Sequence, residues 1–315
     1  MTSDSLYLQF LKKFALKFPL LLKTKNRVKT LAAEICCFIG ISGAKVIGIT
    51  SDGNTILRLN RDYPLGARGS VIQIPKDKKM FEKVRRHGSW ELKISKFIAD
   101  GLKISQQLNE NIALLDIGAN VGLVTLQSLN ISSVACDVFL FEPIPQHAKA
   151  INHNLVGLAN IKIYEVALSD QSGVGKIFTQ NSNRSNTSIL RRVVPEFELI
   201  ETDIVTLDTA EFCRTNLKNY DSYIVKCDIQ GMDALVLSRI PNEIWQNLNR
   251  AVIELWALPE VEKNDVENLL LVLKKFKFLS WYPSSKKTVS ISEIKNFWLS
   301  GSLHNRNLFL SKTAF

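Results

Sequence analysis

A glycine-bearing turn follows a short apolar run near the middle of the chain. The string LLDIGANVG occupies residues 114–122 and passes from a strand into the start of a helix. Gly118 and Gly122 would let a ligand approach the backbone closely, and Asn120 stands between them in a G-x-N-x-G spacing. A pyrophosphate site would have G-x-G-x-x-G, and the charge of Asp116 would repel a pyrophosphate but suit an ammonium and a sulfonium group. The motif therefore favours S-adenosylmethionine over NAD as the cofactor, with a purely structural turn as the alternative.

The next apolar run, FLFEP at residues 139–143, ends on an acid. Glu142 closes this second strand, where it can accept two hydrogen bonds from a ribose diol. Hydrogen bonds to a charged acceptor contribute roughly 1.5–3 kcal/mol each. Pro143 and Pro145 then begin a helix. We place Glu142 and Pro143 in the cofactor site, and the alternative is a solvated glutamate at a strand end.

A third run, VALSD at residues 166–170, follows another short strand. The small side chain of Ala167 would leave room for an adenine ring. Ser169 or Asp170 could form hydrogen bonds with the edge of that ring. The same residue types are common in ordinary turns, so a structural turn is the alternative here.

The fourth run, VKCDIQGMD at residues 225–233, places Asp228 at the tip of a strand. Methyl transfer from a sulfonium is an in-line displacement, and a hydroxyl acceptor must also lose its proton. A buried carboxylate is the natural base for that proton. We predict Asp228 as this catalytic base, with Gln230 orienting the acceptor. The alternative is an acid that merely caps the strand end.

Histidines and cysteines provide weaker candidates. His147 and His153 fall on the helix after Glu142, where a surface position is expected, and His304 in a late loop is the better alternative base. The five cysteines show no CxxC pair. This pattern argues against a disulfide framework and a structural zinc site, and it fits a reducing, cytoplasmic compartment. We therefore expect no metal.

These motifs need a scaffold that brings the ends of several strands together. Strand-like runs alternate with helical stretches in the second half of the chain, at residues 113–117, 138–141, 161–164, 222–227 and 251–255. Such alternation predicts an α/β fold with a doubly wound, mostly parallel sheet. Residues 278–282 and 307–310 would pair antiparallel at one edge, with a polar loop at 283–305 between them. Ligands of such sheets bind beyond the carboxyl ends of the strands, where all four motifs lie.

The N-terminal part of the chain differs in charge from the rest. Residues 1–30 hold seven Lys or Arg and one acid, a charge of +6 (7 − 1) out of a net +10. Their apolar residues have helical spacing, so this segment is expected either to dock on the protein or to touch a membrane surface peripherally. The uncharged run at 35–44 is too short to cross a bilayer. We divide the chain into a basic helical segment (1–44), an extension with a β-hairpin and a helix (45–105), and a cofactor-binding domain (106–315).

Taken together, the motifs resemble those of the FkbM family of methyltransferases. The resemblance rests on five short strings in the family's order: HGSWE at 87–91, DIGANVG at 116–122, FEP at 141–143, ALSDxxG at 167–173 and TLD at 206–208. It implies a class I, Rossmann-like methyltransferase domain with a seven-stranded sheet. It also implies S-adenosylmethionine as cofactor, with Glu91 reaching it, and methylation of a hydroxyl on a glycan, a lipid-linked sugar or a secondary metabolite.

One position departs from the family pattern. The family's fourth motif commonly reads D-x-E-G-x-E, whereas residues 228–233 read DIQGMD. Gln230 can orient a hydroxyl but cannot take its proton. If the family glutamate is a base, that role falls to Asp228 or is weakened. A binding or scaffold protein with the same fold and little catalysis is therefore the alternative.

The acceptor itself is only broadly constrained. We expect a small molecule or a glycan rather than a nucleic acid, because the [ND]-P-P-[YF] motif typical of base methylation is absent at 228–231. The walls of the acceptor pocket are expected from residues 184–197 and 283–305. Arg184, Arg191 and Arg192 could meet an anionic acceptor, or they could simply be solvated.

Overall fold

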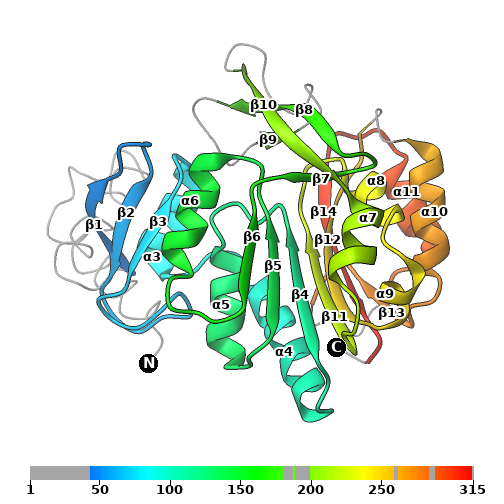
Figure 1. Ribbon diagram of the computed structural model, residues 1–315, viewed down its shortest axis with the longest axis horizontal. Coiled ribbons are helices and arrows are strands. Elements are labelled where there is room, and N and C mark those ends of the chain that lie inside the picture. Colours follow the sequence, from blue (N-terminus) through cyan, green and yellow to red (C-terminus); the bar gives the residue numbers. More distant parts are fainter. Residues whose placement is uncertain (1–42, 181–186, 189–198, 259–261, 284–287, 314–315) are drawn as a thin grey trace, which may run out of the picture.

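The computed structural model describes residues 43–180, 187–188, 199–258, 262–283 and 288–313 (Figure 1). The predicted basic helix lies outside the described residues, and so do Arg184, Arg191 and Arg192. No helix among the described residues combines the length and apolarity that a membrane crossing requires.

A seven-stranded sheet forms the centre of the protein, in the order β13-β14-β12-β11-β4-β5-β6. Its strands are β4 (Ile112–Ile117), β5 (Asp137–Phe141), β6 (Ile161–Tyr164), β11 (Ser222–Cys227), β12 (Leu248–Trp256), β13 (Phe278–Ser280) and β14 (Asn305–Ser311). The pairs from β6 to β12 are all parallel, and β14 runs antiparallel to both β12 and β13. This confirms the Rossmann-like, doubly wound fold of the class I methyltransferase type, with an antiparallel strand pair at one edge of the sheet. The chain order reverses between β4 and β11, which is where such sheets bind ligands.

Helices cover both faces of this sheet, as parallel strands require. Every residue of β4 and of β11 is buried. One face packs against α4 (Leu92–Gln107), α5 (Leu123–Ser132) and α6 (Pro145–Asn154). The other packs against α7 (Thr209–Asn216), α8 (Asp233–Ser238), α9 (Asn242–Gln246), α10 (Lys263–Leu273) and α11 (Ile291–Trp298). Neighbouring residues of β4 therefore pack into different cores: Leu114 belongs to the core shared with α4, α5 and α6, and Leu115 to the core shared with α7 to α11.

The N-terminal extension packs beside α6 (Figure 1). It consists of an antiparallel sheet of β1 (Ala44–Ile49), β2 (Thr55–Leu59) and β3 (Val71–Ile74), followed by α3 (Lys78–His87). The predicted hairpin in this segment is confirmed. Asn154 of α6 receives a hydrogen bond from the backbone N–H of Gln73 (2.7 Å) and donates one to its carbonyl (2.8 Å). The extension shares the apolar core of α4, α5 and α6, so it supports that side of the sheet.

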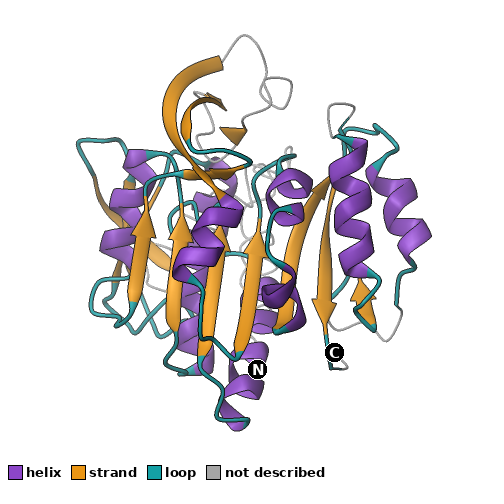
Figure 2. Cartoon of the chain, turned by 45° about the vertical axis from the view of Figure 1, so that its right-hand side comes forward, coloured by secondary structure: helices purple, strands orange, loops and turns teal. Residues whose placement is uncertain are grey.

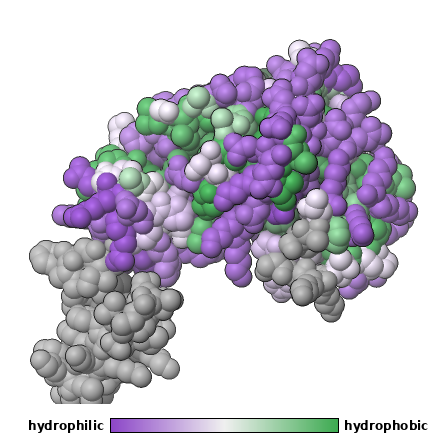
Figure 3. All heavy atoms as spheres, turned by 90° about the horizontal axis from the view of Figure 1, so that it is seen from below, coloured by the Kyte–Doolittle hydropathy of each residue, from purple (hydrophilic) through white to green (hydrophobic). Residues whose placement is uncertain are grey.

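A second, four-stranded sheet rises above the carboxyl ends of the parallel strands (Figures 1 and 2). It is formed by β7 (Ala167–Ser169), β8 (Gly173–Gln180), β9 (Thr187–Ser188) and β10 (Leu199–Asp208), in the order β7-β10-β8-β9. No motif in the sequence predicted this sheet. The opposite face of the molecule, at the amino ends of the parallel strands, is a mixture of hydrophilic and apolar surface (Figure 3).

The segment at 283–305, predicted as a polar loop, contains the helix α11. Ser290 caps this helix: its hydroxyl accepts a hydrogen bond from the N–H of Glu293 (3.2 Å), and the N–H of Ser290 donates one to the carboxylate of Glu293 (2.8 Å). This capping box satisfies backbone groups at the helix start. Ile294 and Trp298 then bury the apolar face of the helix. The loop prediction was wrong because a short amphipathic helix was read as a polar stretch.

Candidate functional site

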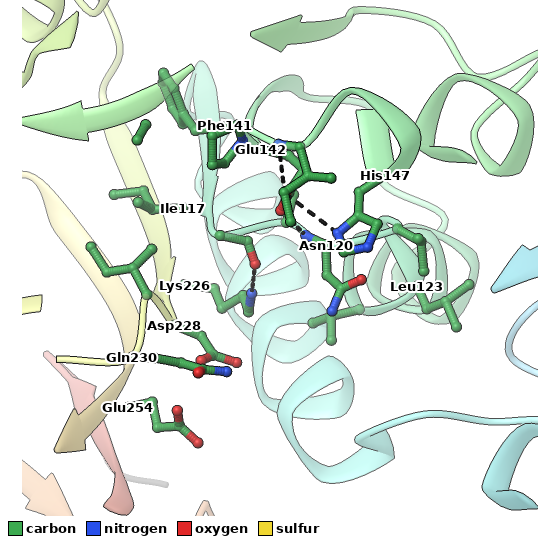
Figure 4. Close-up of a pocket in the computed structure, with 18 of the residues that line it drawn as sticks. Ile117, Asn120, Leu123, Phe141, Glu142, His147, Lys226, Asp228, Gln230 and Glu254 are labelled. Carbon is green, nitrogen blue, oxygen red and sulfur yellow. Dashed lines mark hydrogen bonds and ion pairs between the residues drawn. The ribbon is translucent and has the colours of Figure 1, made fainter. Parts of the chain in front are cut away.

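A cavity of about 320 Å³ lies at the carboxyl ends of β4, β5, β11 and β12. Its wall contains these residues that the sequence pointed to: Glu91, Gly118, Asn120, Glu142, Pro143, Ala167, Asp228 and Gln230. Figure 4 shows Glu142, Asn120 and His147 on one side of this cavity and Asp228, Gln230 and Glu254 on the other. The two sides have different chemistry.

Glu142 is held rigidly at the end of β5. One carboxylate oxygen accepts a hydrogen bond from the N–H of Asn120 (2.9 Å), and the other accepts one from the N–H of Ile144 (3.1 Å). The Nδ1 of His147 lies 3.5 Å from the second oxygen. Each carboxylate oxygen can accept more than one hydrogen bond. Glu142 is therefore positioned in advance and still has acceptor capacity for a ligand's hydroxyl groups.

Two buried polar atoms beside Glu142 have no hydrogen-bond partner among the described residues. They are Asn120 Oδ1 and His147 Nε2, and both residues line the cavity. An unsatisfied buried polar group costs about 1–3 kcal/mol, so native structures seldom keep one without a purpose. His147 is 2% exposed, which corrects the expected surface position. This side of the cavity therefore fits a ligand that carries both hydrogen-bond donors and acceptors.

Asp116 takes a different position from the one that the sequence predicted. Its carboxylate is 1% exposed and lies behind the cavity wall, where it accepts a hydrogen bond from Thr125 Oγ1 (2.7 Å). The Nζ of Lys226 lies 3.0 Å from its other oxygen and donates to the carbonyl of Gly118 (2.6 Å). Asp116 thus holds the turn through a buried ion pair and does not line the cavity. Lys226, a lone cation in an otherwise apolar strand, does line it and was missed.

The two glycines of the turn serve the chain's own packing. A Cβ on Gly118 would lie 2.1 Å from the carbonyl oxygen of Asp228, and its φ of +76° is also unfavourable for other residues. Gly118 therefore lets the turns after β4 and β11 touch. Gly122, with φ of 73°, is the N-cap of α5 and does not line the cavity. Gly118 also lines the cavity, so a ligand can still reach its backbone, whereas Gly122 lies outside the cavity wall.

The third motif contributes an apolar wall. Val166, Ala167 and Leu168 line the cavity together with Phe141 and Ile177. Neither of the two polar residues predicted here is part of that wall. The hydroxyl of Ser169 donates to Asp170 (3.1 Å), and the carbonyl of Ser169 accepts from Thr209 (2.7 Å). These two residues shape the start of the second sheet, while the apolar residues beside them provide a surface suited to an aromatic ring.

Opposite Glu142, carboxyl groups from three elements form an acidic wall: Glu91 before α4, Asp228 after β11 and Glu254 in β12. Burial, followed by the charge of Asp228, raises the pKa of Glu254 well above its ordinary value. The same two causes raise the pKa of Glu91 to about 7.

Glu254 was missed by the sequence analysis. It receives hydrogen bonds from Trp256 Nε1 (2.6 Å) and Asn305 Nδ2 (2.8 Å), which fix both of its oxygens. The sequence does contain a signal for this residue: Glu254 is an acid within the apolar run AVIELW, and burying a charged group in such a strand is costly unless it is paired or has a functional role. Carboxyl groups packed this closely favour a positively charged ligand.

The loop that presents Asp228 and Gln230 is shaped by another acid, Asp233. This buried side chain accepts hydrogen bonds from the N–H groups of Gly231 (3.1 Å) and Ile229 (3.4 Å). Burial and the charge of Asp228 raise the pKa of Asp233 to about 7. Gln230 has φ of 51°, a left-handed conformation within this turn. Asp233 therefore positions the acidic wall without belonging to it.

Among the described residues, no group of three or more His, Cys, Asp or Glu side chains is arranged to hold a metal ion. His304 lines neither this cavity nor the second one described below.

No protein-family model and no curated protein matches the chain. Among solved structures, it is similar to an FkbM methyltransferase from Methylobacillus flagellatus (11% identity, TM-score 0.37), covering 64% of this chain and 43% of that one. A SAM-dependent methyltransferase from Agrobacterium tumefaciens gives 10% identity and a TM-score of 0.38, over 86% and 77% of the two chains. A precorrin-6y C5,15-methyltransferase from Geobacter metallireducens gives 12% and 0.33, over 76% and 94%. The fold assignment rests on the strand order described above.

Proposed function

We propose that this protein is an S-adenosylmethionine-dependent methyltransferase that methylates a hydroxyl group, on a glycan, a lipid-linked sugar or a secondary metabolite. The observation that carries the proposal is the division of the cavity. One side offers a prepositioned carboxylate with unsatisfied polar atoms, the opposite side is acidic, and part of the wall is apolar.

The residues present fit S-adenosylmethionine part by part. Glu142 would accept hydrogen bonds from the ribose hydroxyls, with Asn120 and His147 beside it. Phe141 and Ala167 belong to the apolar wall that would pack on the adenine ring. The acidic wall would attract the positively charged ammonium and sulfonium groups.

A dinucleotide fits the same cavity poorly. Its pyrophosphate would lie near Glu91, Asp228 and Glu254, and the repulsion between like charges in a partly buried site is costly. Among the described residues that line the cavity, Lys226 is the buried cation, and it is already paired with Asp116. The charge distribution therefore supports S-adenosylmethionine over NAD.

When bound, S-adenosylmethionine supplies an electrophilic methyl group on a positively charged sulfur. The protein has to align the acceptor and remove a proton from its hydroxyl. The raised pKa of Glu91, about 7, suits that second task, because a carboxylate with a pKa near neutrality is a better base. Asp228, whose charge contributes to the raised pKa values of Glu91 and Glu254, lies in the same acidic wall.

The proposal is tested by isothermal titration of the full chain with S-adenosylmethionine, S-adenosylhomocysteine and NAD. We expect the two sulfur compounds to bind and NAD not to bind. Glu142→Gln should weaken both affinities roughly tenfold or more, since it removes the charge of the acceptor. Glu165→Gln is the matched control, because Glu165 is an exposed acid directly after β6 that does not line the cavity.

Transfer is measured separately with a labelled methyl donor and extracts of glycolipids and small metabolites. Alkali-stable incorporation would support methylation of a hydroxyl. Binding of S-adenosylmethionine without transfer to any acceptor would instead support a scaffold protein. Binding of NAD in place of S-adenosylmethionine would overturn the proposal.

A further inference from the structure

A second cavity opens beside the first, between the end of α3, the start of α4 and the antiparallel edge of the sheet. Its volume is about 660 Å³, within the range of small-molecule sites. Its wall includes Lys83, Glu91, Lys93, Trp281, Tyr282 and Arg306. Neither the family resemblance nor the four sequence motifs pointed to this cavity as a whole.

Its charge is opposite to that of the first cavity. Lys83, Lys93 and Arg306 line it, and none of these three forms an ion pair with a carboxylate that the structure describes. Among the described residues that line it, Glu91 is the one carboxyl group. Cations that are left unpaired around a concave surface raise the local concentration of anions.

Arg306 is positioned by aromatic rings. Its guanidinium carbon lies 5.5 Å from the ring centre of Trp281 and 4.9 Å from that of Phe297. Stacking of this kind orients the guanidinium while its N–H donors remain free to bind a carboxylate or a phosphate in two places at once. Tyr282 is 66% exposed at the same cavity and offers a flat apolar face next to these donors.

Glu91 lines both cavities. Its backbone has φ of 45° and ψ of 43°, a left-handed conformation that a residue with a side chain seldom adopts. Such conformations cost free energy and concentrate at functional sites. Here the conformation places the residue directly before α4, at the junction of an acidic cavity and a basic one.

We propose that the second cavity binds the methyl acceptor, and that the acceptor is a small ring-bearing molecule with an anionic group, a carboxylate or a phosphate. Arg306 and Lys93 bind the anion, Tyr282 and Trp281 contact the ring, and the hydroxyl to be methylated lies toward Glu91. The proposal rests on the proposed function, because it takes the first cavity as the donor site. The opposite charges of the two cavities would keep the two ligands from exchanging places.

The test uses three probes of similar shape: D-glucuronate, glucose 6-phosphate and, as the neutral control, D-glucose. Binding to the full chain is measured by titration with and without saturating S-adenosylhomocysteine. We expect at least one anionic sugar to bind, and glucose to bind more than about tenfold more weakly. Comparison of the first two probes shows whether a carboxylate or a phosphate is preferred.

Two variants locate the binding site. Arg306→Gln and Lys93→Gln should each raise the Kd of the anionic probe roughly tenfold, because each removes a charge-assisted contact. Lys96→Gln is the matched control: it lies on the exposed face of α4 and lines neither cavity. Since Lys93 and Arg306 are also exposed, these changes leave the fold intact. The affinity for S-adenosylhomocysteine should stay within about twofold in all three variants.

Three results would overturn the inference: equal affinity for glucose and the anionic sugars, no binding of either anionic sugar at millimolar concentration, or binding that neither Arg306→Gln nor Lys93→Gln weakens. Failure of the proposed function looks different. In that case the wild-type protein does not bind S-adenosylmethionine, whatever the sugars do.

Discussion

The Nζ of Lys226 lies 3.0 Å from Oδ1 of Asp116, and both side chains are almost completely buried at the point where the sheet reverses its order. The same ammonium group donates to the carbonyl of Gly118. One buried ion pair therefore ties the turn after β4 to the end of β11. The cavity is built on this link.

Removing one partner of this pair should be costly. Lys226→Met leaves the carboxylate of Asp116 buried without its cation, and we expect a loss of about 3–5 kcal/mol in the free energy of unfolding. Adding Asp116→Asn to this variant should restore part of the loss, because the uncompensated charge disappears. Urea unfolding of both single variants and the double variant measures the coupling. Strictly additive losses would contradict a direct interaction.

The stability of the free protein should fall as the pH rises from about 4.5 to about 7. Burial raises the pKa of Glu91 to about 7, so the folded protein binds more protons than the unfolded chain in this window. The favourable contribution is complete below 4.5 and is lost by pH 7, an effect on the order of 1–3 kcal/mol because the group is partly accessible. Glu91→Gln should make the unfolding free energy flatter over this range. An unchanged pH profile in that variant would argue against a buried, desolvated Glu91.

The affinity for S-adenosylmethionine should rise with pH. The pKa of Glu91 is raised to about 7, so this group loses its proton near neutrality and only then attracts a cation fully, and the pKa of Glu254 is raised in the same direction. We expect the Kd to fall roughly tenfold between pH 5.5 and pH 8, with proton release on binding. S-adenosylhomocysteine, whose sulfur is uncharged, is the matched ligand and should show a smaller change. The same comparison with Glu254→Gln should reduce the difference between the two ligands. Identical pH profiles for both ligands would show that the acidic wall does not interact with the positive charge of the sulfonium.

Gly118 and Gly53 allow a controlled test of the close contact between turns. Both have left-handed φ values, +76° and +84°, but a Cβ on Gly118 would meet the carbonyl of Asp228 at 2.1 Å whereas a Cβ on Gly53 would meet nothing within 4 Å. Gly53→Ala should cost about 1 kcal/mol, the ordinary cost of the left-handed region. Gly118→Ala should cost at least about 2 kcal/mol more and weaken cofactor binding, because the turn after β11 has to move. Thermal unfolding measures both, and equal losses would mean that the turns are not in forced contact.

The strand-ending motifs could be located from the sequence because their signals are local. Short apolar runs that end on glycine or an acid predict where β4, β5 and β11 stop, and parallel strands bring their carboxyl ends to one edge. That reasoning placed Glu142, Asn120 and Asp228 around one cavity, which the structure shows. The helix α11 was missed because its eight residues give a weak periodic signal.

The sequence alone determined the doubly wound parallel sheet and the edge of that sheet at which the functional side chains lie. It could do so because hydrophobic periodicity and turn residues are local features, set by near neighbours in the chain. What only the tertiary structure decided is which side chains face the cavity. Asp116 and Glu254 are both acids in buried strands, yet the first turns away toward Lys226 and the second lines the site beside Asp228. The partner that balances a buried charge comes from a distant part of the chain, and no local pattern encodes that choice.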